Sequence, residues 1–197
     1  TFVRIASYMV MQEALPQCHL LNLISDFDFG VAVPGGCEKF VKAAQVAAEL
    51  GCTLVSCDME KAFNNVLRKD IWETVRYINC PTLTSWFCFF YHIPPRVHFA
   101  ADPSAPFNMG NVVTYTLHEG VAQGDPLSSF LFVCTLARVL ELHRLQHPHF
   151  IRTTVIDDLC FIAPPSHSHR VPAALDDLSD TLQRHNLSLN KPKTTVF

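Results

Sequence analysis

The sequence predicts a single α+β domain. Segments with helical periodicity are interspersed with short β-rich runs, and one pair of these runs is joined by a tight turn, which is typical of α+β folds. Of the 197 residues, 49% are hydrophobic and 17% are charged, as in globular proteins that bury one sizeable core. Since no repeat or low-complexity linker divides the chain, we expect one globular unit.

The expected helices follow from apolar spacing and from residues that end helices. Over residues 37–50 apolar side chains recur at helical spacing, and Gly51 stands where a C-terminal glycine belongs. Helical periodicity resumes over residues 67–79 until Pro81 stops it. Further helices are expected over residues 82–92, 126–145 and 170–186.

The β-rich runs are short and are bounded by turn residues. The run over residues 52–60 ends at an acid, and residues 96–100 and 112–120 are expected to form two strands around a polar loop. TTVIDDLCFIA, residues 153–163, reads as strand, tight turn and strand. Two short extended segments, residues 187–190 and 193–197, are expected to close the chain.

The overall charge does not indicate a nucleic-acid-binding surface. The formal net charge is −3 and the sequence pI is about 6.3, whereas phosphate contacts usually require a basic surplus. The eight cysteines form no C-x-x-C pair, so we expect reduced, buried thiols rather than zinc fingers or a secreted disulfide framework. No apolar stretch approaches the roughly 18 residues that span a bilayer, and we expect a soluble, intracellular protein.

Three aspartates are the candidate catalytic and metal-binding residues. Asp58 follows a strand, and Asp157 and Asp158 stand side by side in an apolar run, where paired carboxylates are costly unless a cation or hydrogen-bond donors compensate them. An antiparallel pairing of the strands would bring all three together as an oxygen-rich Mg²⁺ site, suited to nucleotidyl or phosphoryl transfer. Taken singly, such aspartates are more often turn residues or helix caps.

Three histidines offer a competing metal site. His143 and His147 lie one helical turn apart and His149 follows, and an i, i+4 histidine pair can ligate zinc. No cysteine or acid completes the set in sequence, so polar side chains at a helix end are the favoured interpretation.

Four ordered motifs resemble those of the reverse transcriptase family, and in particular the polymerases of non-LTR retrotransposons. They are CDMEKAFNNV (57–66), GVAQGDPLSSFLF (120–132), VIDDLCFI (155–162) and LSLNKPKT (187–194). The stretch over residues 27–49 also resembles the region before the first motif. The resemblance implies a right-hand polymerase palm, an antiparallel sheet backed by helices, with partial fingers and no thumb. It places fingers at about 1–51 and 93–119, and palm at about 52–92 and 120–197.

The resemblance assigns the three aspartates to the catalytic metal site. It implies that Asp58 and Asp157 bind two Mg²⁺ ions, with Mn²⁺ as the alternative ion, and that Asp158 completes the acidic pair. Two positions depart from the family pattern: Val155 stands where an aromatic residue is usual, and Asn64 where an aspartate is frequent.

Four further residues are implied to bind the nucleotide. Phe63 matches the aromatic steric gate, whose ring leaves no room for a 2′-hydroxyl, and its alternative interpretation is a core phenylalanine. Gln123 and Gly124 match the glutamine–glycine pair beside the incoming nucleotide, although alone they suggest an ordinary turn. Lys193 matches a lysine near the triphosphate, and its alternative is a solvated surface lysine.

The implied function is RNA-directed DNA synthesis. The expected partners are an RNA template, a DNA primer, dNTPs and flanking domains of a longer polyprotein, with no membrane and a nuclear location if the chain derives from a retrotransposon. One rival is an RNA-dependent RNA polymerase, against which Phe63 argues. The other is a catalytically inactive, domesticated palm that acts as a nucleic-acid or protein-binding scaffold; the acidic pI and Val155 favour it.

Overall fold

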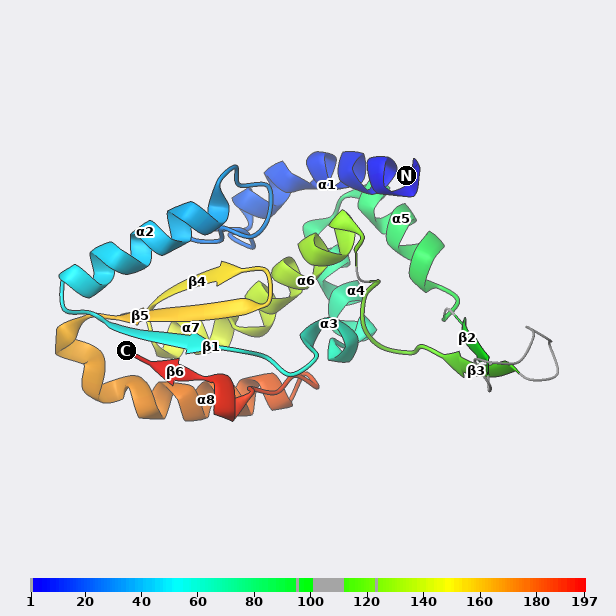
Figure 1. The fold of residues 1–197 in the computed structure, drawn as a ribbon. Helices are drawn as coiled ribbons and strands as arrows, with labels where there is room; N and C mark the ends of the chain where they lie inside the picture. The colour runs from blue at the N-terminus through cyan, green and yellow to red at the C-terminus, as the bar shows by residue number, and fades with distance from the viewer. Residues whose placement is uncertain (1, 95, 101–111, 123) are drawn as a thin grey trace.

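The fold is an antiparallel sheet with helices on both faces and a separate two-stranded hairpin (Figure 1). A computed structural model describes residues 2–94, 96–100, 112–122 and 124–197. The helices are α1 (Phe2–Leu20), α2 (Gly36–Glu49), α3 (Ala62–Asn65), α4 (Arg68–Ile78), α5 (Pro81–Tyr91), α6 (Pro126–Val139), α7 (Glu141–Gln146) and α8 (Val171–Gln183). Two 3₁₀ helices are η2 (Pro165–Arg170) and η3 (Lys191–Lys193).

The sheet has the strand order β4-β5-β1-β6, and every neighbouring pair is antiparallel. Its strands are β1 (Thr53–Cys57), β4 (Ile151–Val155), β5 (Asp158–Ala163) and β6 (Thr195–Val196). The expected α+β fold with an antiparallel sheet backed by helices is therefore confirmed.

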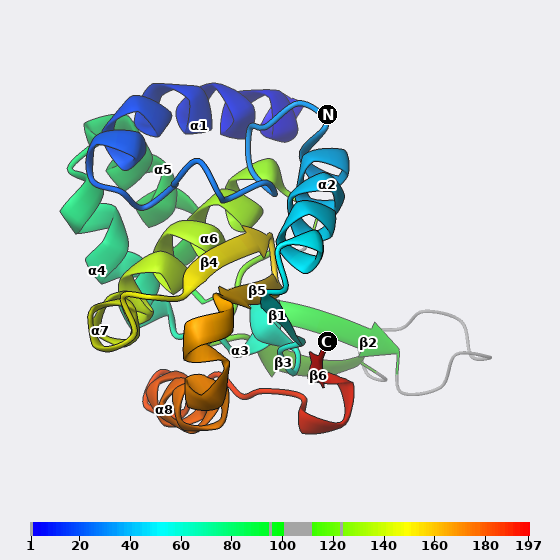
Figure 2. The same ribbon diagram turned by 90° about the vertical axis from the view of Figure 1, so that its left-hand side faces the viewer.

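The helices divide between the two faces of the sheet. Figure 2 shows α2 on one side and α6, α7 and α8 on the other. Along α6 eleven of fourteen residues are buried, because α1 and α4 cover the side of this helix that faces away from the sheet. A helix that is apolar on nearly all sides is stable only in such a core position. The sheet and α6 thus form the rigid base on which the loops are placed.

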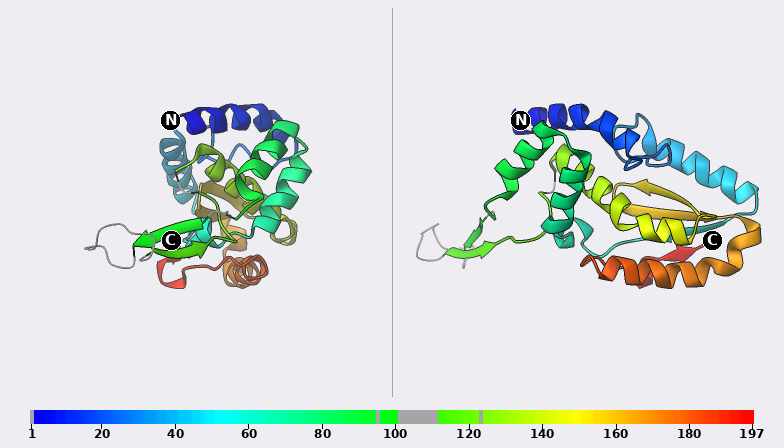
Figure 3. Two further views of the ribbon diagram at one scale, coloured as in Figure 1. Left: turned by 90° about the vertical axis from the view of Figure 1, so that its right-hand side faces the viewer. Right: turned by 180° about the vertical axis from the view of Figure 1, so that it is seen from behind.

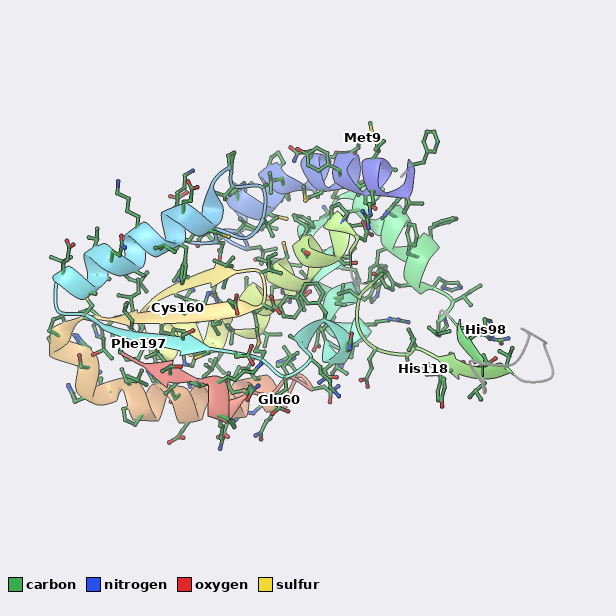
Figure 4. All side chains as sticks on the ribbon, in the orientation of Figure 1. Met9, Glu60, His98, His118, Cys160 and Phe197 are labelled. Atoms are coloured by element: carbon green, nitrogen blue, oxygen red, sulfur yellow. The ribbon has the colours of Figure 1, made fainter. Side chains whose placement is uncertain are left out.

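The hairpin of β2 (Arg96–Ala100) and β3 (Val112–Thr116) extends away from this base (Figure 3). Figure 4 shows the labelled His98 and His118 on this arm, well apart from Cys160 in the sheet. The β2–β3 hairpin follows α5 and precedes α6, so both of its ends connect to segments near the loop before α6.

Most helix boundaries agree with the sequence to within about two residues. Proline opens α5 and α6, and the side chain of Asp125 accepts a hydrogen bond from the Leu127 amide at the start of α6. Gly51 adopts a positive φ of 71° just beyond α2, as its position predicts.

The secondary structure departs from the sequence-based expectation at two places. The sequence did not predict α1. The expected helix over 126–145 turns at Leu140 and continues as α7, which packs on α8. The extended segments expected over residues 187–190 and 193–197 correspond to an isolated bridge between Leu189 and Met59 and to β6.

All eight cysteines are free, as expected, but not all are buried. Cys37 and Cys88 are exposed, and Cys52 is intermediate. Within the described parts of the chain, no helix combines the length and the apolar character needed to cross a bilayer.

The histidine cluster is divided between core and surface, since His143 is buried and His149 is exposed. His143 is only 2% exposed and its Nε2 lies 2.9 Å from the Ala174 carbonyl oxygen, to which a protonated Nε2 donates. His147 contacts Asp177 at 2.9 Å. Among the described residues no three histidine, cysteine or acidic side chains are arranged to hold a metal ion. The favoured interpretation also needs correction, since His143 lies in the core rather than at a polar helix end.

This burial makes stability sensitive to acid. Burial is the main cause that lowers the pKa of His143 below its ordinary value of 6.5. In acid the unfolded chain therefore takes up a proton that the folded chain resists, so His143 destabilises the fold as the pH falls below about 6.5. We expect the melting temperature of the wild-type protein to fall more steeply from about pH 7 to about pH 5.5 than that of His143→Gln. The exposed His149→Gln serves as control; equal slopes for all three proteins would contradict this assignment.

Candidate active site

The antiparallel sheet brings the three aspartates to one end. Cys57 pairs with Leu159, so Asp58 leaves β1 at the point where Asp158 begins β5. Asp157 lies in the two-residue connection between β4 and β5, because Val155 pairs with Asp158. Both aspartates of the pair are exposed, and Asp58 is 35% exposed.

The three carboxylates influence one another electrostatically. The pKa of Asp158 is raised, first by partial burial and then by the negative charges of Asp157 and Asp58. Like charges that are close together disfavour ionisation in this way. The strand register and this mutual influence place the three carboxylates at the same end of the sheet, and their role as a metal site stays a prediction.

The C-terminal segment supplies the partners of Asp58. Asn190 donates from its side-chain amide to Asp58 Oδ2 at 2.8 Å, and its backbone N–H donates to the Asp58 carbonyl, also at 2.8 Å. The Lys193 ammonium lies 3.5 Å from the same Oδ2. Glu60, labelled in Figure 4, donates its backbone N–H to Ser188, which continues the pairing of the two segments. Asn190 was not singled out in the sequence, because nothing local shows that it reaches Asp58.

The turn between β4 and β5 is strained and supported from outside. Ile156 has a φ of 61°, a conformation that β-branched residues rarely adopt. Gly30 lies directly against it: a Cβ added at Gly30 would be 2.2 Å from the Ile156 backbone nitrogen. The segment before Gly30 is hydrogen-bonded to Thr154 of β4. Strain of this kind persists only where surrounding structure holds it, and it is common at functional sites.

Phe63, five residues after Asp58, is part of the packing on α6. Its ring stacks on Phe132 of α6, with ring centroids 4.9 Å apart, and the side chain is partly buried. Its backbone carbonyl accepts from the Val121 amide at 2.9 Å. The structure thus shows the packing role of Phe63, and its role as a steric gate stays a prediction.

The loop before α6 carries the remaining nucleotide-binding candidates. Gly124 has a φ of 85°, and a Cβ added there would lie 3.4 Å from Arg4 Nη2. Gln123 lies outside the described residues. The proximity of Arg4 to Gly124 is a feature that the sequence did not reveal, since α1 itself was not predicted. Arg4 brings a positive charge to the side of this loop.

The three aspartates have the chemistry of ligands for a divalent cation. Mg²⁺ prefers oxygen ligands and usually takes only one or two carboxylates from the protein, completing its shell with water and phosphate oxygens. Among the residues that the structure describes, no three histidine, cysteine or acidic side chains are arranged to hold a metal ion, so Asp58, Asp157 and Asp158 do not form a metal site by themselves. The concentrated negative charge would nevertheless be relieved by a cation. An ion at this end of the sheet would need further oxygen ligands from water or from a phosphate-bearing molecule.

Comparison with known proteins agrees with the motif series. A family profile described as reverse transcriptase (RNA-dependent DNA polymerase) matches residues 3–197. No curated protein matches the sequence.

Solved telomerase structures share the fold. Apo telomerase from Candida tropicalis has a TM-score of 0.68 and 11% identity, over 97% of this chain and 36% of that chain. The apo telomerase of that organism truncated from its C-terminal domain gives 0.65 and 13%, over 96% and 40%. Telomerase from Candida albicans in complex with a TWJ fragment of telomeric RNA gives 0.58 and 13%, over 99% and 34%. The chain thus spans well under half of these telomerase chains, and at such identities the likeness shows the fold alone.

The raised pKa of Asp158 predicts that this carboxylate lowers the stability of the fold at neutral pH. A carboxyl whose pKa is raised by folding destabilises the native state at neutral pH, and that cost disappears once acid protonates the group. In metal-free buffer at neutral pH we expect Asp158→Asn to raise the melting temperature by roughly 1–2 °C, a small effect because the side chain is largely solvated. The difference should vanish below about pH 4.

Thermal unfolding in the presence of a chelator provides the measurement. Asp176→Asn, which removes an exposed carboxylate from α8, is the matched control and should leave the melting temperature unchanged. A lower melting temperature for Asp158→Asn would show that its carboxylate makes a stabilising contact instead.

Proposed function

Because the chain belongs to the reverse transcriptase (RNA-dependent DNA polymerase) family, we propose that it adds deoxynucleotides to the 3′-hydroxyl of a DNA primer under the direction of an RNA template. The observation that carries the proposal is the convergence of Asp58, Asp157 and Asp158 at one end of the antiparallel sheet. Two carboxylate-bearing segments that meet in this way can hold divalent cations against a triphosphate.

Asp58 and Asp157 are proposed to hold two Mg²⁺ ions, with Mn²⁺ as the alternative, and Asp158 to add negative charge beside them. Bound ions of this kind stabilise the charge that develops on the attacking and leaving oxygens of an in-line displacement. The protein's own contribution is to fix the carboxylates: Asn190 orients Asp58, and the support of Gly30 against Ile156 fixes the turn.

The other residues are proposed to act on the nucleotide. Lys193 neutralises Asp58 when no ligand is present, and its largely exposed ammonium is free to turn toward a triphosphate. Phe63 is proposed to exclude the 2′-hydroxyl, which distinguishes this function from RNA synthesis. Gln123 and Gly124 would line the side of the incoming base, where the absence of a side chain on Gly124 permits close approach.

The wider context of the proposal comes from the motif series. The resemblance of residues 27–49 to non-LTR retrotransposon polymerases supports an origin in such an element, and with it a longer polyprotein and a nuclear location. The division into fingers (about 1–51 and 93–119) and palm (about 52–92 and 120–197) is part of the same proposal.

A second candidate, the inactive scaffold, is favoured by one observation. Asp58 Oδ2 already has two protein partners, Asn190 and Lys193, and this arrangement would compete with a metal ion. An inactive palm would keep these contacts permanently.

Primer extension separates the two candidates. On an RNA template with dNTPs and Mg²⁺, in the protein with its natural flanking sequence, we expect extension by the wild type and a loss of about 10³-fold in Asp157→Asn, since a metal-binding carboxylate is removed. Phe63→Ala should lower the preference for deoxynucleotides over ribonucleotides by about 10–100-fold. Asp176→Asn should behave as wild type. A folded wild-type protein that binds the template without extending the primer would identify the inactive scaffold.

A further inference from the structure

Arg68, at the start of α4, binds three backbone carbonyls of the segment that leaves β3. Its Nη1 donates to Leu117 at 2.7 Å, its Nη2 to Glu119 at 3.1 Å and its Nε to Gly120 at 3.1 Å. Only a planar guanidinium presents donors in this fixed fork; the ammonium of lysine cannot reach three carbonyls that follow a curved backbone. Arg68 therefore fixes the path of the chain over these residues.

Tyr91 holds the next part of the same segment. The guanidinium of Arg68 lies over the Tyr91 ring, 5.2 Å from its centroid, and the Tyr91 hydroxyl accepts from the Ala122 amide at 3.3 Å. The same hydroxyl lies 3.4 Å from Ser128 Oγ of α6. Burial lowers the pKa of Arg68, and in the described part of the chain no carboxylate lies within ion-pair distance of it. Arg68 thus contacts backbone carbonyls and an aromatic ring, and these contacts suit a residue that fixes the conformation of residues 117–120.

The opposite side of this segment rests on the stretch that carries Phe63. The Gly120 amide donates to the Val66 carbonyl and the Val121 amide to the Phe63 carbonyl, both at 2.9 Å. A Cβ added at Gly120, which has a φ of 76°, would lie 2.6 Å from the Phe63 carbonyl oxygen. Residues 117–122 are consequently held between Arg68 and Tyr91 on one side and the stretch that carries Phe63 on the other.

We propose that Arg68 is a positioning residue that sets residues 117–122 against the stretch that carries Phe63, and thereby determines how closely the site fits the sugar and base of the incoming nucleotide. This inference rests on the proposed function, because it gives Arg68 a role in selecting the nucleotide. Arg68 does not touch the aspartates in any contact described above. Its loss should therefore affect nucleotide binding and sugar discrimination more than the chemical step.

The test compares Arg68→Lys with Lys69→Ala, an adjacent and largely exposed position on the same helix. In primer extension we expect Arg68→Lys to raise the KM for dNTPs about tenfold with kcat within about threefold of wild type, and to lower discrimination against ribonucleotides by about tenfold. Lys69→Ala should change none of these quantities. A purely structural role would instead lower the amount of folded enzyme and leave the KM and the discrimination unchanged.

Hydrogen exchange tests the loop without requiring activity. The amides of Gly120 and Val121 should exchange at least about tenfold faster in Arg68→Lys than in the wild type, at an unchanged global melting temperature. Unchanged exchange, or an unchanged KM, would overturn the proposal.

Failure of the proposed function is distinguishable from failure of this inference. If the wild type does not extend a primer, we measure equilibrium binding of a fluorescent dNTP instead. Weaker binding by Arg68→Lys than by the wild type and by Lys69→Ala supports the positioning role. Equal binding by all three proteins, or no binding by any of them, overturns it.

Discussion

The pairing of β1 with β5 is the constraint on which the candidate site depends. Their register places Cys57 opposite Leu159, and the two aspartates that follow and precede these residues meet at the sheet end. A slip of one residue would turn every side chain of a strand to the other face and would separate the acids. The register is secured by burial, because Val55 and Cys57 point into the core while Ser56 between them is exposed. The hydrophobic packing of the sheet on α6 therefore fixes the electrostatics of the site.

The site is assembled against the local preferences of its own residues. Three carboxylates repel one another, and Ile156 adopts a backbone conformation that its branched side chain disfavours. Segments distant in sequence hold this arrangement: Gly30 leaves room for the turn, and Asn190 and Lys193 contact Asp58. The carboxylate repulsion and the backbone strain destabilise the fold locally, and burial of the hydrophobic core offsets these costs, as is common at charged ligand-binding sites.

A structural feature could be predicted from the sequence when the residues that determine it are neighbours in the chain. Helix ends at Pro81 and at Asp125-Pro126, and the turn between β4 and β5, were predictable because neighbouring residues determine them. The helix α1 was not predicted because it contains Pro16 and because its apolar residues are divided between the core and the exposed surface. The turn at Leu140 is explained by packing on α8, where His143 contacts the Ala174 carbonyl. The approach of Arg4 to Gly124 and the contacts of Arg68 likewise join distant segments, which no local pattern can reveal.

The hydrogen bond between Asn190 and Asp58 has a consequence for the order of events during synthesis. The two residues are 132 positions apart, and the ribosome makes Asp58 first. At a synthesis rate of about 5–20 residues per second, Asp58 is made on the order of ten seconds before Asn190 exists. For most of that interval β1 also lacks β5, since residues 158–163 are made only shortly before Asn190. The nascent N-terminal half thus exposes a β-strand edge and an acid without its partners, and the candidate site can close only when the end of this segment has emerged.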